Sequence, residues 1–145
     1  MRTMKRKFTS LISLILTAIC AVCLFVSCNK GSAKAEIVSK NETTVVIKIN
    51  ETEGFATLLD AMTYLKEAGE LNFELTGGMV SSIEGKANPA DWSACWMLYT
   101  SDDELSNTEW GTIEYEGQTY ASAAFGAEAL QVAASEYYIW SYQTF

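Results

Sequence analysis

The chain of 145 residues contains no histidine. Histidine is the usual general acid and base near neutral pH, a common zinc ligand, and a common axial ligand of haem or cobalt. Any catalysis would therefore have to depend on carboxylates or a thiol. A pair of carboxylates for glycoside hydrolysis is compatible with the composition, but no motif indicates one and a domain this small rarely forms a deep cleft. We therefore expect a protein that binds rather than an enzyme.

Basic residues are also scarce. The chain has 10 Lys and Arg against 18 Asp and Glu, and no basic residue follows Lys86. Nucleic-acid binding depends on neutralising phosphates with Lys and Arg, so this composition argues against a nucleic-acid partner. Anionic lipid headgroups would also be repelled by such an acidic domain. Membrane contact is therefore expected only through an attached lipid.

Cysteine is confined almost entirely to the amino end, where three of the four cysteines lie within the first 28 residues. Cys95 is the only thiol beyond them, so no disulfide can form within the remainder of the chain. Cys95 has no His or Lys beside it in the sequence, and its place in an apolar segment indicates a small buried residue rather than a nucleophile. Cys20 and Cys23 have a redox or metal spacing, but they lie inside an apolar run.

The amino end has the layout of a secretory signal. Arg2, Lys5, Arg6 and Lys7 precede the apolar run "LISLILTAICAVCLFVS", which at roughly 17 residues is shorter than the ~20 that span a bilayer. The junction "FVSC" followed by "NKGSAKAE" resembles the lipobox of bacterial lipoproteins, whose signal is cut before a lipid-carrying cysteine. We predict a signal peptide over residues 1–27, lipidation of Cys28, a flexible tether over 28–42, and attachment to the extracytoplasmic face of the cell membrane. The alternative is an uncleaved signal anchor.

Residues 43–145 are predicted to form one small domain. Val45, Ile47 and Ile49 alternate onto one face, as in a strand. Residues 57–70 are predicted to form a helix, because Thr57 and Asp60 are spaced for a capping box and Gly69 suits a helix end. The apolar stripe of this helix consists of Leu58, Leu59, Met62 and Leu65.

The remaining segments indicate antiparallel strands. Two short strands are expected around Gly77 and Gly78, a central strand over 93–102, and a polar excursion over 101–111. A hairpin is expected at Glu116-Gly117 and a closing strand over 137–145, with Tyr138, Trp140 and Tyr142 on one face. The predicted fold class is α+β, with one helix packed on antiparallel β-sheet.

The order of the segments "TLLDAM", "GGMVSSIEG", "CWMLYTSDDELSN" and "GAEALQVAASEYYIWSYQTF" resembles the carboxy-terminal β domain of transcobalamin and intrinsic factor and of their bacterial relatives. The resemblance covers about residues 43–145 and depends on order and spacing rather than on one diagnostic motif. It implies the fold of that domain. The chain lacks the large helical domain of the animal proteins, and its segment between the Trp-containing strand and the next hairpin is longer.

The resemblance also implies a ligand site for cobalamin or a related corrinoid, at the glycine-flanked start of one strand and along the Trp-containing strand. A partner protein or a second copy would have to supply the other half of the site. Without histidine, the chain has no imidazole to bind cobalt. The implied ligand-binding residues are Gly77, Gly78, Met79, Val80, Trp96, Met97, Leu98, Tyr99 and Thr100.

Two further features leave alternatives open. Twelve of the 17 aromatic residues lie between Trp92 and Phe145, so Trp96, Trp110 or Trp140 would either form a binding face or fill the core. The acidic loop 101–107 would either bind Ca²⁺ or be solvated. The function we expect is ligand capture at the cell surface; the alternative is an adhesion or spacer module that binds another protein through the same face or a free sheet edge.

Overall fold

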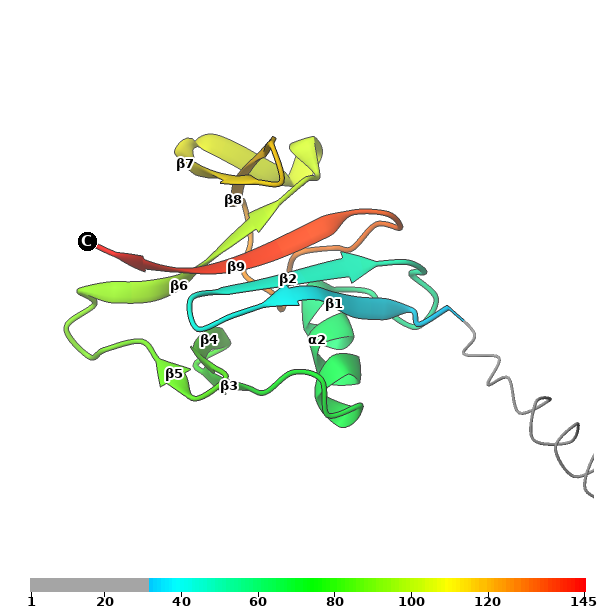
Figure 1. Cartoon of the computed structure of the whole chain (residues 1–145), viewed down its shortest axis with the longest axis horizontal. Helices are drawn as coiled ribbons and strands as arrows, with labels where there is room; N and C mark the ends of the chain where they lie inside the picture. The colour runs from blue at the N-terminus through cyan, green and yellow to red at the C-terminus, as the bar shows by residue number, and fades with distance from the viewer. Residues whose placement is uncertain (1–31) are drawn as a thin grey trace, which may run out of the picture. The chain divides into compact units, whose positions relative to one another are not determined.

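A computed structural model describes residues 32–145, and Ser32–Phe145 form a compact unit. This unit contains a six-stranded antiparallel sheet in the order β1-β2-β9-β6-β8-β7, a three-stranded sheet in the order β3-β4-β5, and helix α2 (Leu58–Glu67) (Figure 1). The predicted α+β class is therefore confirmed. The strands are β1 (Ala35–Lys40), β2 (Thr44–Ile49), β3 (Phe73–Thr76), β4 (Met79–Ile83), β5 (Lys86–Ala87), β6 (Ala94–Thr100), β7 (Ser106–Tyr115), β8 (Gln118–Ala123) and β9 (Tyr137–Thr144).

Helix α2 begins with the predicted capping box. The Asp60 carboxylate accepts hydrogen bonds from the backbone N–H groups of Thr57 (3.0 Å) and Ala56 (2.8 Å). These bonds stabilise the ionised form and lower the pKa of Asp60. The helix ends at Glu67, before the predicted limit of 70, and Gly69 adopts the left-handed φ of +75° that glycine accommodates without strain. The apolar face buries Leu58, Ala61, Met62 and Leu65.

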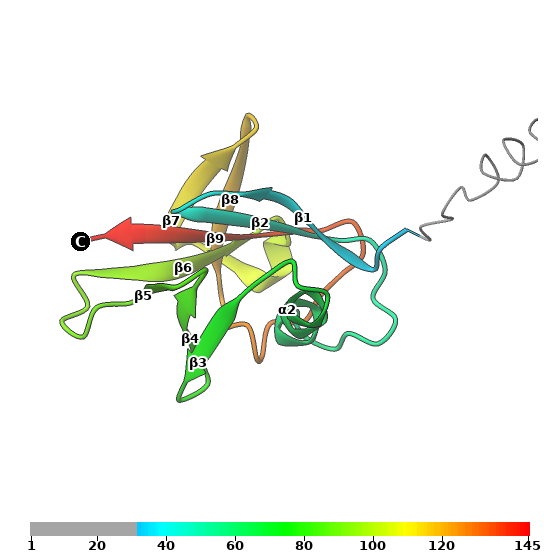
Figure 2. The same cartoon turned by 60° about the horizontal axis from the view of Figure 1, so that its bottom comes forward.

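The large sheet is covered on both faces. Figure 1 shows α2 and the small sheet below strands β1, β2, β9 and β6, and the β7–β8 hairpin, which belongs to the same six-stranded sheet, above them; Figure 2 shows α2 beside β3 and β4. The alternation predicted for β2 and β9 is confirmed, because Val45 and Tyr138 lie in the main core whereas Val46 and Ile139 lie in a second cluster under the hairpin. The register of the two strands explains why these residues share a face: Val45 pairs with Trp140, and Val46 pairs with Ile139.

The expected tether over 28–42 is wrong for residues 35–40. These residues form β1, which pairs antiparallel with β2 from Ala35 opposite Ile49 to Lys40 opposite Val45. Ala35 is fully enclosed and Ile37 packs against the core, so two apolar residues at alternate positions suffice to hold an otherwise polar edge strand. The predicted signal peptide 1–27 and Cys28 lie outside the described residues.

The polar excursion over 101–111 is also corrected. Asp103–Leu105 form a single 3₁₀ turn, and β7 begins directly afterwards at Ser106. The pairing of β7 with β8 shifts between Asn107 and Thr112, so residues 108–111 bulge out of the strand. Their lack of apolar alternation reflects this bulge. The predicted hairpin turn is confirmed, with Glu116 and Gly117 at φ values of 49° and 77°.

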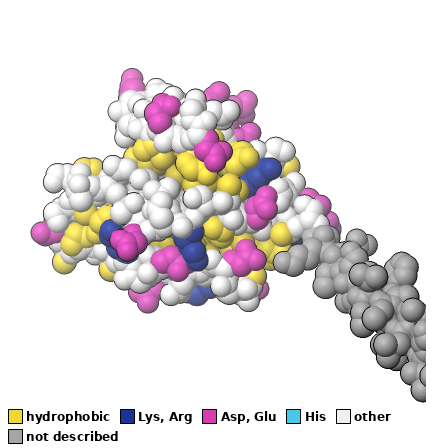
Figure 3. Space-filling model, in the orientation of Figure 1, with side chains coloured by type: hydrophobic (Ala, Val, Ile, Leu, Met, Phe, Trp, Pro, Cys, Tyr) yellow, Lys and Arg dark blue, Asp and Glu magenta, His cyan; other side chains and the backbone are white. Residues whose placement is uncertain are grey.

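The described residues include no helix with the length and apolar character needed to cross a membrane. On the face shown in Figure 3, acidic side chains are spread widely, and hydrophobic side chains gather in a band beneath the β7–β8 hairpin.

Candidate functional site

An open groove of about 320 Å³ lies beside β6, between β4 and the segment that follows β8. None of the described residues that line it is charged, and only Asn88 and Ser122 carry a polar oxygen or nitrogen away from an aromatic ring. The lining residues are Met79, Val80, Asn88, Trp92, Cys95, Trp96, Met97, Leu98, Ser122, Ala123, Ala124, Phe125, Gly126, Ala127 and Trp140.

The groove exists because β6 is paired unequally on its two sides. Strand β9 pairs with every residue of β6 from Ala94 to Thr100. Strand β8 pairs only with Tyr99 and Thr100, after which the chain leaves the sheet at Ala123. Within residues 32–145, the first part of β6 therefore has no sheet neighbour on that side. The buried indoles of Trp96 and Trp140 form part of the lining there.

Three large apolar side chains of the groove lining are exposed to solvent. Met79, Trp92 and Phe125 are 58%, 56% and 51% exposed, and all three line the groove. Seven large hydrophobic residues are exposed among the described residues, so nearly half of them meet at this one place. Exposed apolar surface that is gathered rather than scattered is typical of a binding site.

Trp92 has a backbone conformation that costs energy. Its φ of +57° is uncommon for a residue with a bulky side chain. The turn is fixed by bonds on both sides: the N–H of Trp92 donates to the carbonyl of Pro89 (3.1 Å), and the N–H of Ser93 donates to the Asp91 carboxylate (3.1 Å). The chain therefore holds an exposed indole in a strained conformation, a combination often found at functional sites.

Asn88 joins the small sheet to β6. Its amide nitrogen donates to the carbonyl of Val80 (3.1 Å), and its amide oxygen accepts from the backbone N–H of Trp96 (2.9 Å). Asn88 thus satisfies a backbone group of β6 that no strand pairs with, and it fixes the spacing between β4 and β6. This spacing sets the width of the groove.

The structure brings five of the nine predicted ligand-binding residues to this groove: Met79, Val80, Trp96, Met97 and Leu98. Gly77 and Gly78 form the β3–β4 turn, outside the lining. A Cβ built on Gly78 would lie 2.7 Å from the Glu128 carboxylate, so the small residue permits that side chain's close approach. Tyr99 and Thr100 are buried where β6 pairs with β8, also outside the lining.

The sequence left open whether Trp96, Trp110 and Trp140 form a binding face or fill the core. Trp96 and Trp140 are buried, as the core-packing alternative requires, although each also contributes to the groove lining. Trp110 is 59% exposed on the β7 bulge and does not line the groove. Trp92, Asn88 and Phe125 were not predicted from the sequence as site residues. A bulky aromatic within the polar segment "NPADWS" was the signal that could have indicated Trp92.

Cys95 and Met97 lie on the face of β6 opposite to Trp96 and Leu98; both are half-buried, and Met97 packs against the second cluster. The Cys95 Sγ lies 3.5 Å from the Met97 Sδ. Burial raises the pKa of the Cys95 thiol, because an apolar environment disfavours the thiolate. In the absence of another partner the thiol is therefore protonated at neutral pH, as expected for a non-nucleophilic cysteine.

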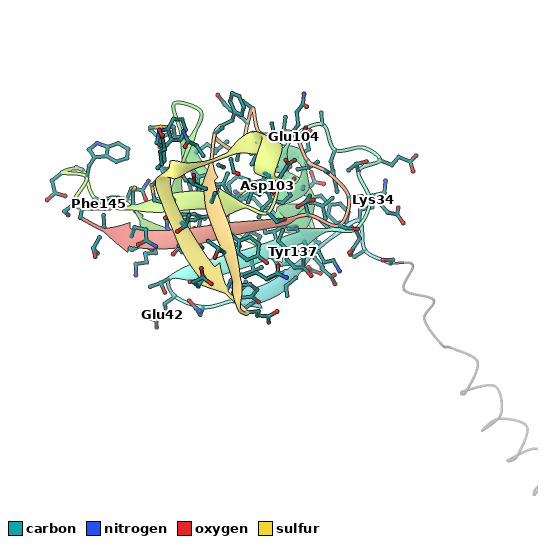
Figure 4. All side chains as sticks on the ribbon, turned by 90° about the horizontal axis from the view of Figure 1, so that it is seen from above. Lys34, Glu42, Asp103, Glu104, Tyr137 and Phe145 are labelled. Carbon is teal, nitrogen blue, oxygen red and sulfur yellow. The ribbon has the colours of Figure 1, made fainter. Side chains whose placement is uncertain are left out.

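Side chains of the acidic loop 101–107 form hydrogen bonds within the protein. The Asp102 carboxylate caps the 3₁₀ turn by accepting from the N–H of Glu104 (2.9 Å), and the Ser101 hydroxyl donates to Glu136. Figure 4 shows Asp103 and Glu104 on this turn. Among residues 32–145, no three His, Cys, Asp or Glu side chains are grouped so that they could hold a metal ion.

Family models, curated proteins and solved structures were each compared with this chain, and none matches it.

Proposed function

We propose that this protein is a lipid-anchored binding domain on the extracytoplasmic face of a bacterial membrane, and that its ligand lies in the groove beside β6. The observation that carries the proposal is the convergence of Met79, Trp92 and Phe125 on one uncharged groove. None of the described residues that line the groove is charged, and the Cys95 thiol in its lining is protonated at neutral pH. Holding a ligand, rather than transforming it, is the role that these groups support.

The proposed ligand is flat and apolar, with cobalamin or a related corrinoid as the first candidate. This choice depends on the resemblance to the transcobalamin carboxy-terminal domain and on the five predicted residues that line the groove. A groove of about 320 Å³ lies at the lower end of the range of small-molecule sites. It would cover only one edge of a corrin ring, so a partner protein or a second copy would have to cover the remainder.

The second candidate is an adhesion or spacer module that binds another protein. It is favoured by a different observation, because the two edges of the large sheet, β1 and β7, have no strand on their outer sides among the described residues. The β7 edge also carries the exposed Trp110. An aromatic side chain on a sheet edge is a common anchor in protein interfaces.

Binding of a corrinoid separates the two candidates. Residues 29–145 would be dialysed against cyanocobalamin or cobinamide, with bound corrin measured by its absorbance. The groove proposal predicts saturable binding that Met79→Glu or Phe125→Glu weakens at least tenfold, since either carboxylate would stand in an apolar site. Trp110→Glu is the matched control: it places the same charge at an equally exposed apolar position outside the groove, and leaves binding unchanged.

Two outcomes would count against the groove. Equal weakening by Trp110→Glu and Phe125→Glu would mean that corrinoid associates with any exposed apolar side chain. Absence of binding at high micromolar ligand, with the protein folded, would favour the adhesion module.

A further inference from the structure

The sulfur atoms of the domain are concentrated in the groove. Residues 32–145 contain four sulfur-bearing side chains, of Met62, Met79, Cys95 and Met97. Met62 is buried in the main core under α2, and the other three line the groove. The three sulfurs of the described residues that lie outside the main core thus belong to one site, whose described lining has no carboxylate and no histidine.

We propose that this groove binds a soft monovalent metal ion, Cu(I), between the Cys95 Sγ and the Met97 Sδ, with the Met79 Sδ as third ligand. This proposal is independent of the corrinoid proposal and would hold for either candidate function. Thiolate and thioether sulfurs select Cu(I) over harder cations, which prefer carboxylate and carbonyl oxygen. The described residues that line the groove offer sulfur ligands and include no carboxylate.

The separation of the first two sulfurs suits a shared ion. Alternate residues of a strand lie on the same face, and the Cys95 Sγ and Met97 Sδ are 3.5 Å apart. With metal–sulfur bonds of about 2.3 Å, this separation corresponds to roughly 100° at the metal. Two ligands are therefore already spaced for a three- or four-coordinate ion without any change of backbone.

Met79 is suited to complete the set. It begins β4, lines the same groove and is 58% exposed, so its side chain has room to turn. Methionine has three rotatable bonds and a polarisable sulfur. A ligand of this kind adapts its position to an ion that two β6 side chains have fixed.

The charge balance also fits the site. When Cu(I) binds, the Cys95 S–H bond breaks, its proton passes to solvent, and a copper–sulfur bond forms without any change of oxidation state. One thiolate and two uncharged thioethers then give a complex with no net charge. A neutral complex can occupy an apolar groove without the desolvation cost that a charged one would incur.

The test uses residues 29–145, because Ser32–Phe145 form a compact unit with their own core and this fragment excludes the three cysteines of the first 28 residues. Under anaerobic conditions the protein would compete with bicinchoninate for Cu(I), with the loss of the coloured complex measured. We expect one Cu(I) per chain. Zn(II) in tenfold excess should not displace it.

Variants identify the ligands. Because losing even an outer-shell partner of a metal site costs 10–100-fold in affinity, Cys95→Ser and Met97→Leu should each weaken Cu(I) binding at least about 100-fold, and Met79→Leu about tenfold. Met62→Leu is the matched control, an identical exchange at the core sulfur, and should leave affinity unchanged. Thermal melting of each variant establishes that it is folded.

The proposal is overturned if the folded wild-type fragment takes up no Cu(I), or if Met97→Leu binds as tightly as wild type. Corrinoid binding is measured by dialysis in the presence of a Cu(I) chelator, so that copper does not affect the result. The copper proposal can therefore be wrong while the corrinoid proposal is right, and the reverse.

Discussion

The indole Nε1 of Trp96 donates a hydrogen bond to the backbone carbonyl of Lys86, 2.8 Å away. This bond joins the lining of the groove to β5, and Asn88 reinforces it by accepting from the Trp96 backbone N–H. The groove is therefore supported by polar contacts as well as by packing. Trp140, the other buried indole of the lining, differs: its Nε1 is enclosed and has no hydrogen-bond partner among the described residues.

This contrast predicts unequal effects of the same substitution. Trp96→Phe and Trp140→Phe remove the same atoms from comparably buried sites, but only Trp96→Phe leaves the Lys86 carbonyl without its donor. An unsatisfied buried group costs about 1–3 kcal/mol, whereas removal of an unpartnered donor relieves such a cost. We expect Trp96→Phe to lower the free energy of unfolding by at least about 1 kcal/mol more than Trp140→Phe, measured by urea denaturation. Equal losses would contradict this assignment.

The capping box of α2 predicts a loss of stability at its N-terminus. Asp60→Ala removes the acceptor of the Ala56 and Thr57 N–H groups and should lower the free energy of unfolding by about 1 kcal/mol at pH 7. Because the folded pKa of Asp60 is lowered, its contribution is present above the pKa of the unfolded chain and is lost as the pH falls through the folded pKa. The difference between wild type and variant should therefore shrink in acid. Glu67→Ala, at the other end of the helix, is the control.

Alkaline pH should destabilise the domain. Burial raises the pKa of Tyr138, the largest fully buried side chain among the described residues, and also raises the pKa of Cys95. A group whose folded pKa is raised stabilises the native state below its unfolded pKa, and that stability is lost as the pH rises through the folded pKa. The melting temperature should thus fall above about pH 10, where unfolded tyrosine ionises. Tyr138→Phe should be less stable at neutral pH but lose less on going to high pH. An unchanged alkaline slope in the variant would count against Tyr138 as a cause.

The predicted anchor can be tested on the expressed full chain. Mass spectrometry of the membrane fraction should find a chain that begins at Cys28 and carries acyl chains on it. Cys28→Ser should release the domain from the membrane or leave the signal uncut, whereas Cys95→Ser should leave the anchor intact. An unmodified Cys28, or retention of residues 1–27 in wild type, would show that the lipoprotein prediction is wrong.

Residue periodicity predicted much of the fold. The alternation in β2 and β9 and the spacing of Thr57, Asp60 and Gly69 indicated their elements correctly, because local pattern and tertiary burial agree there. β1 was missed because it is a polar edge strand with few buried side chains, so its pairing with β2 is a tertiary contact that local sequence does not show. The β7 bulge likewise hides the strand period, which is the signal that sequence analysis uses.

The candidate site was predicted only in part. The site residues that lie on β4 and β6 were predicted, because an apolar strand is recognisable in the sequence. Trp92, Asn88 and Phe125 come from irregular segments, and their placement depends on where β8 leaves the sheet and on the strained turn at Trp92. Neither the end of β8 nor the turn at Trp92 produces a periodic pattern of apolar residues in the sequence.

Binding of a corrinoid in the groove beside β6 is tested most directly by a nuclear magnetic resonance titration of ¹⁵N-labelled residues 29–145 with cyanocobalamin. If the groove is the binding site, backbone amide shifts should cluster at Val80, Leu98 and residues 124–126 and should saturate at one ligand per chain. Shifts confined to the β1 or β7 edge, or no shifts at millimolar ligand, would show that the groove is not a corrinoid-binding site.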